Sequence, residues 1–330
     1  MQPRVLFICG SLNQTTINYE IARHLRDCDC RFTPFYGDGM VNALAAAGLL
    51  DFTILGGEAR ERTERFLAAR RCRIDHRGSA QRYDLVVTCS DLIVPRNVEG
   101  TPLILVQEGM VDPQGMGTRL VRRLRLPRYL GNTAMAGLSH AYETFCVASE
   151  GFARRFVENG VDPRKIAVTG IPNFDNVQGA LQNDFPFHDY VLGATSHLRE
   201  TFKYENRKAF IERVCEIAAG RPIIFKLHPC EAAARAMAEI EKYAPGAMVF
   251  REGNLQEMIA NCHCMVTRYS SVMLLALAMG KRVFSDLPDE ELGDLAPLQN
   301  GGASARRIAA ICRRTLTRAA TRTAHLQAVG

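Results

Sequence analysis

The sequence of 330 residues contains no tryptophan, and no apolar run approaches the roughly 18 residues of a transmembrane helix candidate. The first stretch, MQPRVLFICGSLNQ, has too short an apolar run for a secretory signal and predicts a β-strand instead. Basic stretches interleaved with stacking aromatic residues are also absent, which argues against RNA or DNA as a partner. The sequence therefore predicts neither a membrane span nor a nucleic-acid partner.

The eleven cysteines lack the C-x-x-C spacing that is typical of zinc sites. The segment NCHCMV is a C-x-C pair within an apparent strand, where Cys262 and Cys264 point to one side and His263 to the other. That alternation prevents chelation, so no metal site is expected. Several cysteines lie in other apparent buried strands, which predicts reduced thiols in a cytosolic protein.

Hydrophobic residues make up 47% of the chain and charged residues 23%, as in a soluble globular protein. The formal charge of +6 and a pI near 8.8 favour anionic partners. Many basic residues lie in 119–128 and 306–322. The first stretch, RLVRRLRLPR, alternates arginine with leucine. It is either a solvated helix face or a segment in peripheral contact with an anionic membrane surface.

Apolar runs alternate with amphipathic stretches, the pattern of an α/β protein with parallel sheets. We expect strands at 4–10, 31–37, 84–90, 102–108, 144–149, 165–170, 189–195, 222–228, 247–252, 263–267 and 282–286. Helices are expected at 14–27, 58–71, 115–126, 150–160, 204–219, 231–243, 255–261, 271–279 and 303–320. There is no repeat of solenoid period.

The strands form two βαβ series, separated by a stretch rich in Pro, Asn, Asp and Gly. We therefore predict two doubly wound, Rossmann-like domains that face each other across a cleft. The first covers 1–170, a hinge covers 171–187, and the second covers 188–302, while a helical segment at 303–330 packs back across the hinge. Ligands of such sheets bind at the carboxyl ends of the strands, so residues directly after strands are the candidates.

The segment VTRYSSVMLLALAMGKRVFS (266–285) joins an apolar strand to an apolar helix through Arg-Tyr-Ser-Ser. Ser270 or Ser271 is expected to cap this helix and Gly280 to end it. A helix N-terminus offers free amides and the positive end of the dipole to an anion. One serine would be a plain cap, whereas two hydroxyls with the charge of Arg268 predict a phosphate site.

Two more strand ends in the second half carry polar and basic residues. In FKLHP (225–229), Lys226 and His228 end a strand, and in ATSHLRETF (194–202) the turn contains Ser196, His197 and Arg199. Both turns suit an anion, although a lone histidine is more often structural.

In the first half, Glu108 ends the strand PLILVQ and precedes Gly109, which leaves space for a substrate. Glu108 is our candidate general base, with a simple turn cap as the alternative. The loop GSLNQTT (10–16) carries Ser11, Asn13 and Thr15 after the first strand. It lacks the G-x-G-x-x-G dinucleotide fingerprint, so we interpret it as an acceptor-side loop.

Together these features resemble the GT-B glycosyltransferase superfamily, and within it the CDP-glycerol glycerophosphotransferases and UDP-N-acetylglucosamine 2-epimerases. The resemblance depends on VTGIPNFD (168–175), KLHP (226–229) and NLQEMIANCHCMVTRYSSVMLLALAMGKRVF (254–284). It departs from these families where Arg268 replaces an acidic residue and Arg282 stands at a common proline position. It covers about half the chain.

The resemblance implies a GT-B-like fold in which the second domain binds a UDP- or CDP-linked donor, with no other cofactor, and the first binds the acceptor. The resemblance implies that the phosphate of this donor contacts Ser270, Ser271, Arg268, Arg199 and Lys226. Catalysis would involve Glu108 and His228, and the nucleotide would contact Glu252 and Asn254.

The sequence thus predicts a transferase that moves a sugar or polyol-phosphate to a cell-envelope polysaccharide or a lipid-linked acceptor. We expect it in the cytoplasm, and, where 119–128 contacts a membrane rather than forming a solvated helix face, at the inner face of that membrane. One alternative is an isomerase of the UDP-N-acetylglucosamine 2-epimerase kind; the few carboxylates expected in the cleft count against it. Another is a nucleotide-sugar binding protein without catalysis.

Overall fold

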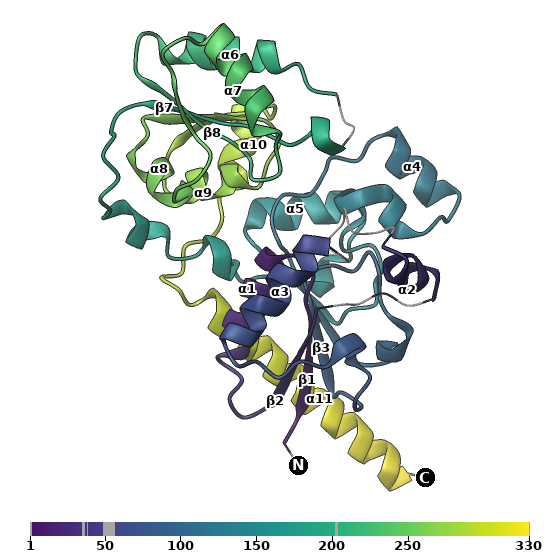
Figure 1. Ribbon diagram of the computed structural model, residues 1–330. Helices are drawn as coiled ribbons and strands as arrows, with labels where there is room; N and C mark the ends of the chain where they lie inside the picture. Colours follow the sequence, from purple (N-terminus) through teal and green to yellow (C-terminus); the bar gives the residue numbers. More distant parts are fainter. Residues whose placement is uncertain (1, 35–36, 38, 49–56, 202–203, 330) are drawn as a thin grey trace. The chain divides into compact units, whose positions relative to one another are not determined.

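The computed structural model describes residues 2–34, 37, 39–48, 57–201 and 204–329. The chain forms two compact units, each with one parallel sheet and its own helices (Figure 1). The first unit comprises Met1–Asp175 and Asn300–Gly330, and the second comprises Asn176–Gln299. The chain leaves the first unit within the stretch 171–187 that the sequence suggested as a hinge.

The sheet of the first unit has the strand order β2-β1-β3-β4-β5-β6, and all its pairs are parallel. Its strands are β1 (Arg4–Ile8), β2 (Asp29–Thr33), β3 (Leu85–Thr88), β4 (Leu103–Val106), β5 (Thr144–Val147) and β6 (Ile166–Val168). The central strands are continuous apolar runs, and β3 and β4 are buried along their whole length. Such runs are expected where helices cover both faces of a parallel sheet.

The sheet of the second unit has the order β11-β10-β7-β8-β9, again with parallel pairs. Its strands are β7 (Val191–Ala194), β8 (Ile223–Lys226), β9 (Met248–Phe250), β10 (Cys264–Thr267) and β11 (Arg282–Phe284). Gly193 in β7 is required by packing, because a Cβ there would lie 2.6 Å from the ring of Phe225. The core around that ring includes Val191, Ile211, Val214 and Ile240.

The helices lie between the strands in the order that the sequence predicts, and several begin at side-chain caps. The α-helices of the first unit are α1 (Leu12–Ala22), α2 (Gly39–Ala46), α3 (Gly57–Ala69), α4 (Met116–Arg123), α5 (Glu150–Glu158) and α11 (Ser304–Val329). Those of the second unit are α6 (Arg207–Ala218), α7 (Ala233–Tyr243), α8 (Leu255–Asn261), α9 (Val272–Ala278) and α10 (Asp289–Asp294). Ser11, Ser149, Asn206 and Asn254 each accept a backbone N–H of the first helical turn, the usual satisfaction of free amides.

The C-terminal helix α11 belongs to the first unit, where it contacts α1 and β3 (Figure 1). Asp175 binds the start of this returning segment, since its carboxylate accepts the backbone N–H of Asn300 at 2.6 Å and that of Ser304 at 2.8 Å. Burial alone would raise the pKa of Asp175, but these amides lower it. Arg313 adds an ion pair with Asp27 at 2.7 Å.

The eleven predicted strands are all present within the described residues, which confirms the α/β prediction. The second strand begins two residues earlier than expected, and positions 35–36 of its predicted range lie outside the described residues. The helices α2 and α10 were not predicted, because both are short and α10 has an acidic rather than an apolar periodicity. Cys262 and Cys264 are buried and His263 is exposed, as predicted, although β10 begins only at Cys264.

None of the helices in the described ranges combines the length and the apolar character needed to cross a bilayer.

Candidate functional site

Each sheet has one point where the strand order reverses, and ligands of open parallel sheets bind beside it at the carboxyl ends of the strands. In the first unit the reversal lies between β1 and β3, and in the second unit between β7 and β10. The predicted site residues fall after β1 and β4 in the first unit, and after β7, β8, β9 and β10 in the second, except Lys226, which is the last residue of β8. We describe each unit by itself.

In the first unit, the carboxylate of Glu108 accepts hydrogen bonds from three neutral side chains. The hydroxyl of Ser11 donates at 2.8 Å and the amide of Gln14 at 2.6 Å, while the amide of Asn13 donates at 3.3 Å. Glu108 follows β4 and the three donors lie at the start of α1, so the network crosses the end of β3, which separates the two strands. No arginine or lysine contributes to these bonds, and Glu108 is partly exposed.

The predicted acceptor-side loop is the cap and first turn of α1. Ser11 caps the helix by accepting the N–H of Gln14, and Asn13 receives a hydrogen bond from the amide of Asn173 at its backbone carbonyl, at 3.2 Å. Thr15 is buried, and its hydroxyl donates to the carbonyl of Ser11 at 2.8 Å. Thr15 therefore stabilises the turn, whereas Ser11 and Asn13 bind Glu108.

Two other carboxylates of the first unit have local structural partners. Asp91 is fully buried and accepts the backbone N–H groups of Gly137 and Ser139, each at 2.9 Å. Asp112 accepts the hydroxyl of Thr133 at 2.8 Å. Of these three carboxylates, Glu108 is the one that is bound by side chains at the start of α1, the helix that follows β1 at the switch point.

In the second unit, His228 follows β8 and its ring stacks on that of His197, with centroids 4.0 Å apart. Burial, with smaller contributions from His197 and Lys226, lowers the pKa of His228 to about 4. The imidazole is therefore neutral at physiological pH. Its Nδ1 accepts the backbone N–H of Cys230 at 3.1 Å, so the proton of the neutral ring resides on Nε2.

The backbone of His228 is fixed by a short relay of hydrogen bonds. Its N–H donates to the hydroxyl of Thr195 at 3.0 Å, and this hydroxyl donates to the carboxylate of Glu231 at 2.5 Å. Thr267 ties β10 to β7 at the same edge, because its hydroxyl donates to the carbonyl of Ala194 at 3.1 Å. The relay therefore fixes the turn that carries His228 next to the switch point, with Nε2–H as a neutral hydrogen-bond donor.

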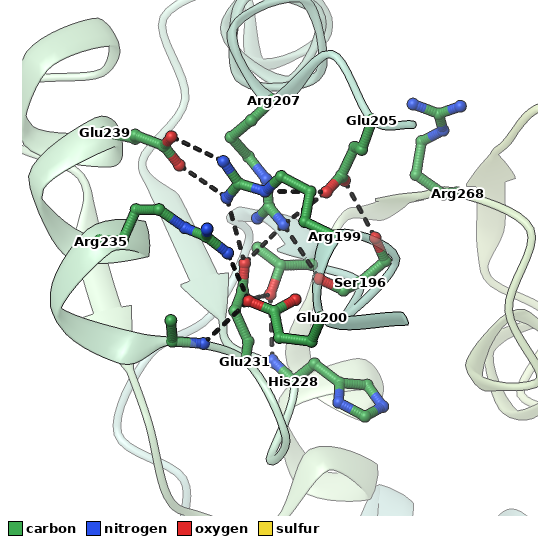
Figure 2. Close-up of polar contacts among 12 residues, drawn as sticks. Ser196, Arg199, Glu200, Glu205, Arg207, His228, Glu231, Arg235, Glu239 and Arg268 are labelled. Atoms are coloured by element: carbon green, nitrogen blue, oxygen red, sulfur yellow. Dashed lines mark hydrogen bonds and ion pairs between the residues drawn. The ribbon is translucent and has the colours of Figure 1, made fainter. Parts of the chain in front are cut away.

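Beyond this relay lies a buried cluster of ion pairs (Figure 2). Arg207 binds Glu231 at 2.5 Å and Glu205 at 2.9 Å, and the side chains of both glutamates are fully buried. Arg199 binds Glu239 through two parallel hydrogen bonds of 2.7 and 2.8 Å. Burial raises the pKa of Glu231, opposed by the hydrogen bond from Thr195 and by the charge of Arg207. In Figure 2 the ring of His228 points away from this cluster.

Two residues predicted to bind the donor phosphate have other partners. The guanidinium of Arg199 is held by Glu239 and lies within 3.8 Å of Glu231 and 3.6 Å of Glu205. Lys226 is buried, and its Nζ donates to the carbonyls of Leu227 and Arg251 at 3.1 and 3.0 Å. Both cations already have bonding partners, so an anion would have to displace them.

The Arg-Tyr-Ser-Ser turn follows β10, on the other side of the switch point from β7. Ser271 occupies the N-cap position of α9 but makes no side-chain cap bond, and the hydroxyl of Ser270 accepts the N–H of Val272 at a long 3.5 Å. The expected side-chain cap is therefore weak, because Ser271 has helical rather than extended backbone angles. Arg268 forms an ion pair with Asp286 at 2.6 Å.

The predicted nucleotide contacts lie at the edge of the same sheet. Glu252 and Asn254 follow β9, and both are exposed. The side-chain oxygen of Asn254 caps α8 by accepting the N–H of Gln256, and its side-chain amide donates to Glu257 at 2.8 Å. Two strands separate β9 from β10, so these residues are the farthest of the predicted set from the switch point. Among the described residues, no group of three or more His, Cys, Asp or Glu is arranged to hold a metal ion.

The sequence analysis missed the residues that hold the candidates in place. In the first unit these are Gln14 and Asn173, and in the second they are Thr195, Glu205, Arg207, Glu231 and Glu239. The available signal was the pair Glu205 and Arg207 around the cap Asn206, where two opposite charges precede an apolar helix. Glu239 lies within α7 and Glu231 lies two residues before its first residue, and in the sequence both look like ordinary surface positions.

No protein-family model matches the sequence, and no curated protein sequence matches it significantly. Solved structures do match the fold over nearly the whole chain. The UDP-GlcNAc 2-epimerase of Neisseria meningitidis bound to UDP-GlcNAc matches with a TM-score of 0.59 at 12% identity, over 94% of this chain and all of its own. The wall teichoic acid polymerase TagF, in a form soaked with CDPG, matches with a TM-score of 0.53 at 13% identity, over 96% of this chain and 90% of its own.

The chain has a GT-B-like fold. This confirms the predicted fold class and the resemblance stated from the sequence. Within the GT-B-like frame, Glu108 and its donors lie at the switch point of the N-terminal Rossmann-like unit. His228, Ser270 and Ser271 lie around that of the C-terminal unit.

Proposed function

We propose that this protein is a transferase that uses a UDP- or CDP-linked donor. It moves a sugar or a polyol-phosphate to a cell-envelope polysaccharide or a lipid-linked acceptor. The observation that carries the proposal is the neutral Nε2–H of His228, held at the carboxyl end of β8, with β7 between β8 and the strand β10 that leads to Ser270 and Ser271. The GT-B-like fold supports it, since structures of this fold have been solved with CDPG and with UDP-GlcNAc.

The donor phosphate would lie at this edge of the second unit. His228 supplies a hydrogen bond without adding a positive charge, and the Ser270–Ser271 turn adds hydroxyl donors. Negative charge grows on the nucleoside phosphate or diphosphate as the bond to the transferred group breaks, and fixed donors stabilise that charge. His228 is then an electrophilic catalyst and not a base, because its Nδ1 already accepts a hydrogen bond. Arg268 remains a candidate contact through the part of its guanidinium that Asp286 does not bind.

Glu108 is the proposed general base on the acceptor side. It would take the proton of an acceptor hydroxyl while the oxygen attacks the donor, and the nucleoside phosphate or diphosphate would leave. Its carboxylate has a capacity of about four hydrogen bonds, of which Ser11, Asn13 and Gln14 occupy three. One acceptor position therefore remains for a substrate hydroxyl. The neutral donors orient the carboxylate without forming an ion pair that would compete for it.

An isomerase acting on a UDP-sugar is the second candidate. The epimerase of Neisseria meningitidis gives a higher TM-score than TagF and is covered over its full length. An epimerase of this kind would need carboxylates that shuttle protons without an acceptor. In the first unit Asp91 and Asp112 have structural partners, which leaves Glu108 as the carboxylate at the switch-point helix.

The deciding experiment incubates the protein with a panel of UDP-sugars and CDP-polyols, with and without acceptor polymer, and follows the products by NMR. Nucleotide release that depends on the acceptor supports the transferase. Inversion of the sugar with the nucleotide retained supports the isomerase. Binding of a donor without turnover in either arm identifies a binding protein and rejects both catalytic candidates.

A further inference from the structure

The helix α4 and the loop after it expose an unusual number of large apolar side chains. Met116, Leu120 and Leu124 lie at i, i+4 and i+8 and are 87%, 53% and 57% exposed. This spacing places them along one stripe of the helix surface. The buried residues of α4 are Thr118 and Val121, so the helix packs through a small face and leaves its apolar stripe uncovered.

The exposed apolar character continues beyond the helix. Leu126, Tyr129 and Leu130 follow in the loop and in the 3-10 segment Arg128–Met135, and Leu130 is 58% exposed. This segment packs against α4. We call residues 116–130 the basic–apolar face. Singly scattered apolar residues on a surface are ordinary, but a contiguous set of this size marks an interaction site.

The charge of the basic–apolar face has one sign. Its five arginines alternate with the apolar residues, and the stretch contains neither aspartate nor glutamate. Arg119, Arg123 and Arg125 are exposed. An apolar stripe flanked by cations fits a surface that is apolar inside and anionic at its boundary, which is the physical description of a bilayer with acidic headgroups.

A small cavity lies beside the same face. It has a volume of about 320 Å³, and its basic lining comprises Arg122, Arg125, Arg128 and His140. Its apolar lining comprises Val121, Leu126, Met135 and Leu138. Arg125 is held at the end of α4 with a φ of 52°, a conformation that is costly for a residue with a side chain. A phosphate bound there would contact several guanidinium groups while its alkyl chains ran along the leucines.

We infer that the basic–apolar face docks on the surface of an anionic lipid bilayer, with Met116, Leu120 and Leu124 at the acyl boundary and the arginines on the headgroup phosphates. The occupant is a bilayer rather than a protein partner because the face combines one sign of charge with an exposed apolar stripe. The inference does not rest on the proposed transferase activity. It concerns the first unit alone and is tested without substrate.

The test measures co-sedimentation of the full chain with vesicles. Phosphatidylcholine vesicles that contain phosphatidylglycerol should bind the protein, vesicles of phosphatidylcholine alone should bind it at least tenfold less, and raised ionic strength should release it. Leu120→Ser with Leu124→Ser should lower the partition coefficient at least tenfold, because two apolar side chains leave the acyl boundary. Arg119→Gln with Arg123→Gln should lower it about thirtyfold, since each arginine near an anionic surface contributes about fivefold.

Matched control variants test whether binding depends on the position of these residues in the basic–apolar face or only on the charge and apolar content of the chain. Arg306→Gln with Arg307→Gln removes the same charge from exposed positions of α11, and Met237→Ser removes an exposed apolar side chain from the second unit. Both should bind as the unmodified protein does. Arg125→Asn tests the cavity while keeping a residue that tolerates positive φ. Circular dichroism of each variant establishes that it is folded.

Three results would overturn the inference. The first is an equal loss of binding in the α11 control, which would reduce the effect to net charge. The second is a change of oligomeric state in the leucine variant, by light scattering, without a change in vesicle binding, which would make the face a contact between copies. The third is displacement from vesicles by duplex DNA with the same dependence on the arginine pair, which would assign it to nucleic acid.

Discussion

The two units hold their central carboxylates in opposite ways. Glu108 in the first unit is partly exposed and is bound by neutral hydroxyl and amide donors. Glu231 in the second unit is buried and is bound by the guanidinium of Arg207 and the hydroxyl of Thr195. A carboxylate with neutral donors keeps its charge uncompensated, whereas one paired with a buried cation contributes to structure.

This difference separates a reactive group from a supporting one. The carboxylate of Glu231 binds the hydroxyl of Thr195, which in turn binds the backbone of His228. Glu231 therefore influences the chemistry only through His228. Glu108 has an open acceptor position and is a candidate to meet a substrate directly. The predictions below test the comparison from the largest expected effect to the smallest.

Glu108→Gln should lower the turnover number by about a hundredfold to ten thousandfold, the usual contribution of a general base. Donor affinity should remain nearly unchanged and the protein should stay folded, because the amide oxygen can replace the carboxylate oxygen that accepts from Ser11 and Asn13, while the bond from Gln14 to the other oxygen is lost. Steady-state kinetics with the donor identified by the panel measures the effect. Asp112→Asn is the matched control and should retain activity. Full activity of Glu108→Gln would reject Glu108 as the base.

Glu231→Ala should destabilise the second unit by about 3–5 kcal/mol, the cost of removing one partner of a buried ion pair. Scanning calorimetry should show a lower transition for this unit. The control Glu241→Ala removes an exposed glutamate of α7 and should change stability by less than about 0.5 kcal/mol. Equal transitions in the two variants would show that the Arg207 pair does not stabilise the unit.

Ser270→Ala combined with Ser271→Ala should weaken donor binding about tenfold, since hydrogen bonds to charged groups contribute about 1.5–3 kcal/mol. Unfolding free energy should change by less than about 2 kcal/mol, the range of a lost cap. Isothermal titration with the donor or with its nucleotide measures the first quantity. The control is Ser139→Ala in the first unit. Undiminished affinity in the double variant would remove the serines from the phosphate site.

The effect that is smallest at neutral pH is the pH dependence of stability that His228 contributes, because it develops only in acid. Its pKa is about 4 when folded and 6.5 in its ordinary range, so between these values the unfolded chain binds a proton that the folded chain does not. Stability should therefore fall as the pH is lowered from 6.5 to 4. Melting curves of the unmodified protein and of His228→Asn should converge in this window. A constant difference between them across it would contradict the lowered pKa.

The sequence predicted the elements well because their signals are local. The apolar runs of β3 and β4 and the caps Ser11 and Ser149 mark strands and helices from neighbouring residues alone. It also placed Glu108 and His228 after the right strands. The partners of these residues could not be predicted, since Gln14 and Glu108 are 94 positions apart and Thr195 and Glu231 are 36 apart.

The same limit explains why the basic candidates of the second unit have other partners. Arg199 and Lys226 were assigned to a phosphate from their charge and position. Which anion meets a cation depends on packing, and here Glu239 and two backbone carbonyls reach them first. A positively charged residue near a strand end therefore predicts a phosphate contact less well than a neutral hydrogen-bond donor whose other polar atoms already have partners.

The contact between Asp175 and Asn300 has a consequence for how the chain can be divided. Their hydrogen bond brings together the two points where the polypeptide leaves and re-enters the first unit, with the 124 residues from 176 to 299 between them. The second unit is thus an insertion whose ends start side by side. Excising it and joining Asp175 to Asn300 through a short glycine linker should leave the first sheet and α11 intact, giving a shorter protein on which lipid docking can be studied alone.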